Sequence, residues 1–177
     1  SRLVDKVYSF EPVISSYRYL CRNIELNNIK NVIPLNVALS DKCSLIEVTN
    51  IPYGEANKIV ETHILEDEIC REYDFINVYA ITFDKLNNYY LHLEENKKII
   101  IKIDTESHEQ YVLNGAQSFL KNNFPILVCM ECTIRNKNSL IEFMNSLKYK
   151  QIDIYNFPNL VNDEENIYFA NDYFLKE

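Results

Sequence analysis

Glycine is the residue type that most constrains this chain, because only two of its 177 residues are glycine, Gly54 and Gly115. At an average usage of about 7%, a chain of this length would carry roughly 12. Phosphate-binding loops and dinucleotide-binding fingerprints each need several glycines close together. Neither motif therefore exists within these residues.

The rest of the composition is that of one globular domain with a sizeable core. Hydrophobic residues make up 47% of the chain, and no apolar run reaches the ~18 residues of a membrane span. The chain has 18 basic and 26 acidic residues, which leave a formal net charge of −8. Nucleic acids and anionic membranes both require a basic surface, so this balance argues against either as the main partner.

The cysteines predict a reducing compartment and hence a cytoplasmic location, because they are odd in number and lie in apolar or amphipathic stretches. They are Cys21, Cys43, Cys70, Cys129 and Cys132. The last two have C-x-x-C spacing without a second pair or a nearby histidine. On a strand they would point to opposite faces, so we interpret them as core residues and predict no metal site.

Apolar runs alternate with amphipathic stretches, a pattern typical of an α/β domain. The runs predict strands over residues 7–10, 31–39, 44–49, 76–82, 99–103, 125–130, 151–155 and 166–169. Helical spacing predicts helices over residues 15–28, 83–96 and 139–149, and another that begins at the capping box Ser107-x-x-Gln110 and ends before Pro125. Two adjacent strands at the end of this order predict an open, mainly parallel sheet with an antiparallel last strand.

Acidic side chains follow three of the predicted strands. Glu11 follows the first, Asp104 and Glu106 follow residues 99–103, and Glu131 follows the strand that begins at Pro125. Ligands of open α/β sheets bind beyond the carboxyl ends of the strands, where a carboxylate is the usual partner of ribose hydroxyls. Glu11 fits that role, and a cap on the following helix is an equally good interpretation of it.

The segment Asp104-Thr105-Glu106-Ser107-His108-Glu109 gathers three carboxylates and an imidazole. Close like charges raise one another's pKa, and such clusters are typical of functional sites. We interpret Glu109 as structural, since a carboxylate in the first turn of a helix favours the macrodipole. A metal hydrolase built on Asp104, Glu106 and His108 is a further hypothesis, disfavoured because the histidine is expected on the helix, past the strand end.

Seven short motifs follow one another along the chain. They are Val7-Tyr8-Ser9-Phe10-Glu11-Pro12, Leu20-x-x-Asn23, Asn36-Val37-Ala38-Leu39-Ser40-Asp41, Thr82-Phe83-Asp84-Lys85-Leu86, Ile101-Lys102-Ile103-Asp104-Thr105-Glu106-Ser107-His108-Glu109, Val112-Leu113-x-Gly115-Ala116 and Pro125-Ile126-Leu127. Each is modest alone, but the ordered set resembles the FkbM family of S-adenosylmethionine-dependent methyltransferases.

The resemblance implies a single methyltransferase domain over residues 1–177, with the Rossmann-like sheet of class I methyltransferases. It also implies methyl transfer from S-adenosylmethionine to a hydroxyl of a small molecule, such as a sugar or polyketide-like acceptor. Glu11, flanked by Phe10 and Pro12, would hold the ribose of the cofactor. The adenine pocket would be lined by Ala38, Leu39, Ser40 and Asp41.

On the acceptor side, the resemblance implies that Asp104 and Glu106 face the substrate, with Glu106 or His108 as the general base. An in-line displacement needs the nucleophile held in place and its proton removed. Ser107 stands where the family has glycine, which predicts a changed backbone turn at this position.

The family's first strand and its glycine-bearing cofactor loop have no counterpart in these residues, so we expect the domain to be incomplete at its amino terminus. In the family's order that strand lies between the strands at residues 7–10 and 99–103, which are then not direct neighbours. The alternative is a non-catalytic remnant or binding module of the same fold. Residues upstream of Ser1 with a D-x-G-x-x-x-G-like strand end would favour the enzyme.

Overall fold

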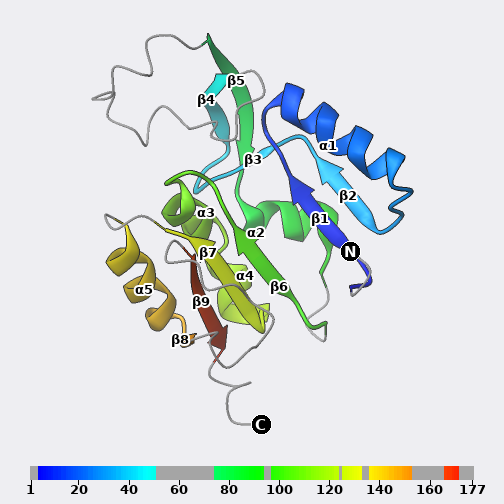
Figure 1. Cartoon of the computed structure of the whole chain (residues 1–177). Helices are drawn as coiled ribbons and strands as arrows, with labels where there is room; N and C mark the ends of the chain where they lie inside the picture. The colour runs from blue at the N-terminus through cyan, green and yellow to red at the C-terminus, as the bar shows by residue number, and fades with distance from the viewer. Residues whose placement is uncertain are drawn as a thin grey trace. The chain divides into compact units, whose positions relative to one another are not determined.

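Figure 1 shows a computed structural model of the chain, which describes residues 4–50, 74–93, 97–123, 125–132, 136–152 and 166–171. The chain divides into two compact units, Ser1–Ile81 and Thr82–Glu177. None of the helices in the described ranges is long and apolar enough to cross a membrane.

The first unit begins with a parallel strand pair joined by a helix. Strand β1 (Val7–Phe10) pairs with β2 (Val32–Leu35), and α1 (Ile14–Leu26) connects them and packs along β2 (Figure 1). The prediction of a strand over residues 7–10 is confirmed. The strand ends at Glu11-Pro12 because proline has no N–H to continue the ladder.

The strand predicted over residues 31–39 is two strands, β2 and β3 (Ala38–Leu39), separated at Asn36. The Asn36 Nδ2 donates to the backbone oxygens of Glu11 and Pro12, both at 2.9 Å. This side chain ties the residue after β2 to the backbone that follows β1, at the point where the β1–β2 ladder ends, and β3 pairs with a different strand. The amide side chain thus explains a break that apolar patterning alone does not predict.

Strand β3 lies parallel to β5 (Asp74–Ile81), which also pairs antiparallel with β4 (Ser44–Asn50). Both longer strands match the predicted runs to within two residues. Alternate side chains point to the core, as the period of two requires. The core of this unit is formed by Val13, Ala38, Ile46, Val48, Val78 and Ala80.

The second unit holds a four-stranded sheet in the order β6-β7-β9-β8. Strands β6 (Ile100–Ile103) and β7 (Leu127–Glu131) are parallel, whereas β9 (Asn166–Asn171) is antiparallel to both β7 and β8 (Tyr149–Ile152). The predicted α/β fold with an antiparallel strand near the end of the chain is confirmed. Strand β6 belongs to this sheet and β1 to the two-stranded one.

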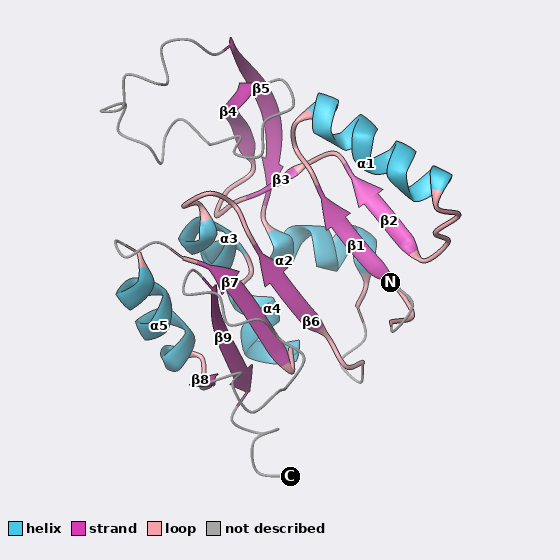
Figure 2. Ribbon diagram, in the orientation of Figure 1, coloured by secondary structure: helices cyan, strands magenta, loops and turns pink. Residues whose placement is uncertain are grey.

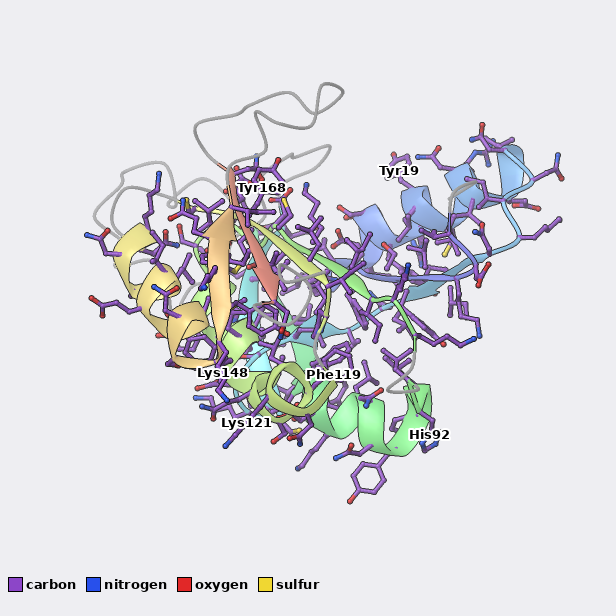
Figure 3. All side chains as sticks on the ribbon, turned by 90° about the horizontal axis from the view of Figure 1, so that it is seen from below. Tyr19, His92, Phe119, Lys121, Lys148 and Tyr168 are labelled. Atoms are coloured by element: carbon purple, nitrogen blue, oxygen red, sulfur yellow. The ribbon has the colours of Figure 1, made fainter. Side chains whose placement is uncertain are left out.

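One face of the four-stranded sheet is apolar. Val128, Met130, Ile167 and Phe169 alternate along β7 and β9 and are at most 2% exposed. They belong to a core shared with α3 (Glu109–Gly115), α4 (Gln117–Asn123) and α5 (Lys137–Ser146). Figure 2 shows α3 and α4 behind β6 and β7, and in Figure 3 Tyr168 projects from the side of the sheet away from Phe119 of α4.

The helix predicted over residues 83–96 is shorter than expected. Helix α2 (Phe83–Leu86) runs into a π-helical turn, η3 (Asn87–Leu91), and residues 94–96 lie outside the described ranges. His92 adopts a left-handed conformation with φ of 49°, and the N–H of Leu93 bonds to the Asn87 side chain at 2.9 Å. These two features end the helix.

The Thr82-Phe83-Asp84-Lys85-Leu86 motif is structural in the second unit. Thr82 Oγ1 accepts from the N–H of Lys85 and so caps α2. The Asp84 carboxylate accepts from Ser118 N–H at 2.9 Å and Phe119 N–H at 2.8 Å, donors in the first turn of α4 that have no partner within the helix. Phe83 packs edge-on against Phe119, with ring centroids 4.8 Å apart. The motif therefore binds two helices together.

We expect Asp84→Ala to lower the free energy of unfolding by about 1–3 kcal/mol, because it leaves two helix-start donors without their charged acceptor. Urea denaturation measures the loss. Lys85→Ala, at an exposed neighbouring position, is the matched control and should change stability by less than about 0.5 kcal/mol. Equal stability of the two variants would show that Asp84 does not support α4.

Candidate functional site

Glu11 lies at the carboxyl end of β1, where the sequence predicts a ligand-binding carboxylate. Its Oε1 accepts from the N–H of Val13 at 2.8 Å, at the start of α1. This bond fixes the turn that leads into α1, but among the described residues no side-chain hydrogen bond caps this helix, so the helix-cap interpretation is wrong. The other oxygen, Oε2, has no hydrogen-bond partner within the part of the chain that the structure describes.

The surroundings of Glu11 disfavour its charged form. Burial raises the pKa of this carboxyl group above its ordinary value, and the hydrogen bond from Val13 only partly opposes that rise. Here the charged form of the carboxylate is disfavoured, and one of its oxygens has no hydrogen bond to the described residues. Carboxylates in such surroundings are typical of functional sites.

The backbone on either side of Glu11 is tied to the β2–β3 connection. The N–H of Glu11 donates to Leu35 O at 3.0 Å, and Asn36 bonds to the carbonyls of Glu11 and Pro12. Our sequence interpretation did not single out Asn36 as a site residue. Its place at the head of the Asn36–Asp41 motif is the signal that could have identified it.

The other residues predicted at the cofactor lie in the same unit. Phe10 and Pro12 are half-buried beside Glu11, and Ala38 and Leu39 form β3. Ser40 is 2% exposed, and its N–H donates to Ile81 O at 3.1 Å. Its hydroxyl donates to Oδ1 of the exposed Asp41 at 3.3 Å. These contacts fix the backbone that follows β3.

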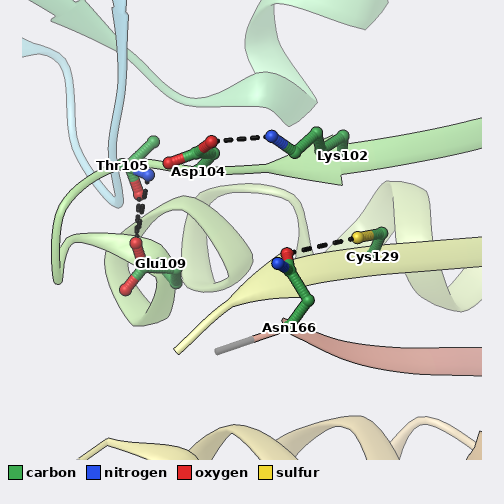
Figure 4. Close-up of polar contacts among 6 residues, drawn as sticks. All are labelled: Lys102, Asp104, Thr105, Glu109, Cys129 and Asn166. Atoms are coloured by element: carbon green, nitrogen blue, oxygen red, sulfur yellow. Dashed lines mark hydrogen bonds and ion pairs between the residues drawn. The ribbon is translucent and has the colours of Figure 1, made fainter. Parts of the chain in front are cut away.

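Asp104 follows β6 and is part of an ionic group in the second unit. Its Oδ2 bonds to Lys102 Nζ at 2.7 Å (Figure 4). The parallel register pairs Ile103 with Met130, so the residues after them, Asp104 and Glu131, are neighbours at the sheet edge. Hydrogen bonding with Glu131, followed by Lys102, holds the pKa of Asp104 below its usual value. Asp104 is therefore charged at neutral pH and a poor proton acceptor.

Glu106 and Ser107 both adopt positive φ, 51° and 76°. This left-handed region favours glycine, because a Cβ crowds the following carbonyl. The glycine that the family carries at the position of Ser107 thus has a conformational reason. Here serine adopts the glycine-like conformation.

Ser107→Gly should raise the free energy of unfolding by about 0.5–1 kcal/mol. A non-glycine residue pays about 1–2 kcal/mol in the left-handed region, and the greater freedom of unfolded glycine cancels part of the gain. Thermal and urea unfolding measure the change, and Ser139→Gly on helix α5 is the control, expected to destabilise. A loss of stability in Ser107→Gly would contradict the strain argument.

The residue that caps the start of α3 by position is His108, whereas the predicted capping box places Ser107 there. His108 is the residue that precedes α3, and Gln110 Nε2 bonds to Asn114 Oδ1 at 3.2 Å instead of returning to Ser107. The capping-box prediction is wrong. The His108 ring is 3% exposed and stacks on Tyr111, with centroids 4.6 Å apart and planes 7° from parallel.

Glu109 is the residue whose role our sequence interpretation most underestimated. It does lie in the first turn of α3, as predicted, but it is only 1% exposed. Its carboxylate accepts hydrogen bonds from Thr105, Ser107 and Asn136. Nothing in the sequence distinguishes this carboxylate from an exposed one, because two of its four donors are backbone N–H groups and a third, Asn136, lies 27 residues away.

The metal hydrolase hypothesis finds no support in the geometry. Within the described ranges, no three or more histidine, cysteine, aspartate or glutamate side chains are grouped so that they could hold a metal ion. Cys21, Cys43, Cys129 and Cys132 are free thiols, and Cys70 lies outside the described residues. Burial raises the pKa of Cys129, whose Sγ donates to Asn166 Oδ1 at 3.7 Å (Figure 4).

Comparison with known proteins gives one family and one fold. The sequence profile of the Methyltransferase FkbM domain matches residues 3–151. The crystal structure of methyltransferase FkbM from Methylobacillus flagellatus KT superposes with a TM-score of 0.59 at 12% identity. The alignment covers 94% of this chain and 36% of that one. No curated protein sequence matches the chain.

Proposed function

Because this chain belongs to the FkbM methyltransferase family, we propose that the full-length protein transfers a methyl group from S-adenosylmethionine to a hydroxyl of a small molecule. We further propose that both units belong to one methyltransferase domain, since the matched residues 3–151 run through the boundary between them. The free thiols support a reducing, cytoplasmic compartment.

The observation that carries the proposal is the Glu11 carboxylate at the end of β1. A half-buried carboxylate with an unused oxygen suits the paired hydroxyls of a ribose. This hydrogen-bond acceptor therefore fits the ribose hydroxyls of S-adenosylmethionine, whose adenine would be lined by Ala38 and Leu39 with Ser40 and Asp41. When bound, this cofactor supplies an electrophilic methyl group.

On the acceptor side, Glu106 is our choice for the general base. A base must reach the hydroxyl proton, and Glu106 is half-buried whereas His108 is 3% exposed and stacked. Asp104 has a lowered pKa and keeps its charge, so it would orient the hydroxyl by accepting a hydrogen bond. Glu106 would take the proton that the hydroxyl loses as its oxygen gains the methyl group.

The test uses the full-length protein. Calorimetric titration with S-adenosylhomocysteine should show one site per chain. Radiolabelled S-adenosylmethionine is then supplied with a panel of glycosides and other hydroxyl compounds, and transfer of label to one of them is expected. A folded full-length protein that binds no S-adenosylhomocysteine would overturn the proposal and favour the non-catalytic alternative.

A further inference from the structure

The carboxylate of Glu109 is a buried charge that the proposed mechanism does not use. Glutamate is rarely buried, because removing its charge from water is costly unless hydrogen bonds compensate. Here the residue is 1% exposed. Hydrogen bonds must compensate this buried carboxylate, so the residues that donate them indicate what Glu109 does.

Four donors converge on this carboxylate. Oε1 accepts from Thr105 N–H at 3.1 Å, Thr105 Oγ1 at 3.0 Å and Ser107 N–H at 3.1 Å. Oε2 accepts from Asn136 Nδ2 at 3.0 Å. Figure 4 shows the contact between Thr105 and Glu109. Hydrogen bonds to an ionised acceptor are stronger than hydrogen bonds between neutral groups, so this carboxylate restrains the residues that donate to it.

The anchored residues lie on both sides of Glu106. Thr105 precedes it and Ser107 follows it, and both donate a backbone N–H to the same oxygen. Glu106 and Ser107 are the two residues with positive φ in this turn. Such conformations persist only where the surrounding structure holds them. The Glu109 carboxylate supplies that restraint.

The fourth donor comes from another connection. Asn136 immediately precedes α5 and lies beyond the end of β7. In a parallel pair such as β6 and β7, the residues after both strands lie at one edge of the sheet. Glu109 therefore joins the turn after β6 to the start of α5 at the edge where ligands of α/β sheets bind.

We propose that Glu109 is a positioning residue, which locks the 105–107 turn to Asn136 and so holds Glu106 in one place for proton removal. This inference rests on the proposed function. Methyl transfer tolerates little displacement, because a shift of about 1 Å in a reacting group can lower the rate by about 100-fold.

Three variants of the full-length protein separate positioning from simple stabilisation. Glu109→Asp keeps the charge on a shorter side chain, which cannot reach all four donors. Glu109→Gln keeps the length but directs an amide N–H at Asn136, which is itself a donor. Adding Asn136→Asp to Glu109→Gln restores an acceptor opposite that amide. Glu142→Gln, at an exposed position on α5, is the control.

Hydrogen exchange of the Thr105 and Ser107 amides is the first readout. We expect exchange at both to accelerate by about 10-fold or more in Glu109→Asp, beyond any change at β6 amides, because local opening no longer breaks an ionic hydrogen bond. The control should leave both rates unchanged. Unchanged protection in Glu109→Asp would overturn the proposal whether or not the protein is a methyltransferase.

Turnover is the second readout, with the acceptor identified by the label-transfer screen. We expect kcat to fall by about 100-fold in Glu109→Asp, while S-adenosylhomocysteine affinity stays within about twofold. Glu109→Gln should also lose turnover, and adding Asn136→Asp should restore most of it. Two results would contradict the positioning role of Glu109. One is a loss of turnover no larger than the unfolded fraction measured by urea titration, and the other is a double variant that does not recover turnover. A wild-type protein without transfer would count against the proposed function instead, and the exchange rates would still decide the role of Glu109.

Discussion

Glu106→Gln is expected to lower the rate of methyl transfer by about 10²–10⁴-fold, the range for loss of a general base. The amide is close to isosteric with the carboxylate, so the turn after β6 should keep its shape, but an amide cannot accept the hydroxyl proton. Single-turnover transfer at saturating cofactor measures the effect directly. The melting temperature should change little.

Two further variants show whether such a loss belongs to the base. Glu142→Gln makes the same chemical change on an exposed helix face and should retain full activity. Asp104→Asn should lower turnover less than Glu106→Gln, since the lowered pKa of Asp104 makes it a poor proton acceptor. Normal transfer by Glu106→Gln together with a large fall in melting temperature would mean that Glu106 is structural, and His108 would become the candidate base.

Glu11→Ala should weaken binding of S-adenosylhomocysteine by about 1–3 kcal/mol, equivalent to roughly 5- to 150-fold in Kd. The alanine variant also loses the acceptor for Val13 N–H. Glu11→Gln keeps an oxygen for that helix-start bond and loses only the charge, so it separates the two roles of the residue. Full affinity in Glu11→Ala would remove this residue from the cofactor site.

The pH dependence of stability provides an independent check on Glu11. Its pKa is raised in the folded chain, so the folded state binds a proton more tightly than the unfolded state. The unfavourable contribution is fully present well above the folded pKa and is relieved as the pH falls through that value toward the unfolded value of 4.5. Glu11→Gln without ligand should therefore be at least as stable as wild type at pH 7, and the two should converge on acidification.

The strand pattern and the α/β class could be predicted because alternation and β-branched runs depend on residues close in sequence. Breaks within predicted strands and helices could not be predicted where contacts between residues far apart in sequence cause them. Asn36 splits a predicted strand by bonding to backbone 24 and 25 residues away. Lys148, with φ of 66°, separates α5 from β8, so the buried Tyr149 begins a strand where helical spacing predicted the end of a helix.

The candidate site was predictable to a similar extent. The acids after β1 and β6 could be located because they follow recognisable strands, and the order of motifs indicated the family. Burial and partners could not be read from the sequence: His108 is packed under Tyr111, and Glu109 is surrounded by donors rather than by solvent. Those properties depend on where the turn after β6 folds back.

The position of β9 has a consequence for how the second unit is made on the ribosome. Strand β9 lies between β7 and β8, although it is the last of the four to be synthesised. Until residues 166–171 emerge, β8 has no strand to pair with, and the edge of β7 that does not face β6 stays open to other chains. The four-stranded sheet therefore completes late, after a pairing of high sequence separation, which is the slow kind of step in folding. Nascent chains that stop short of β9 would expose this edge to chaperones and to aggregation.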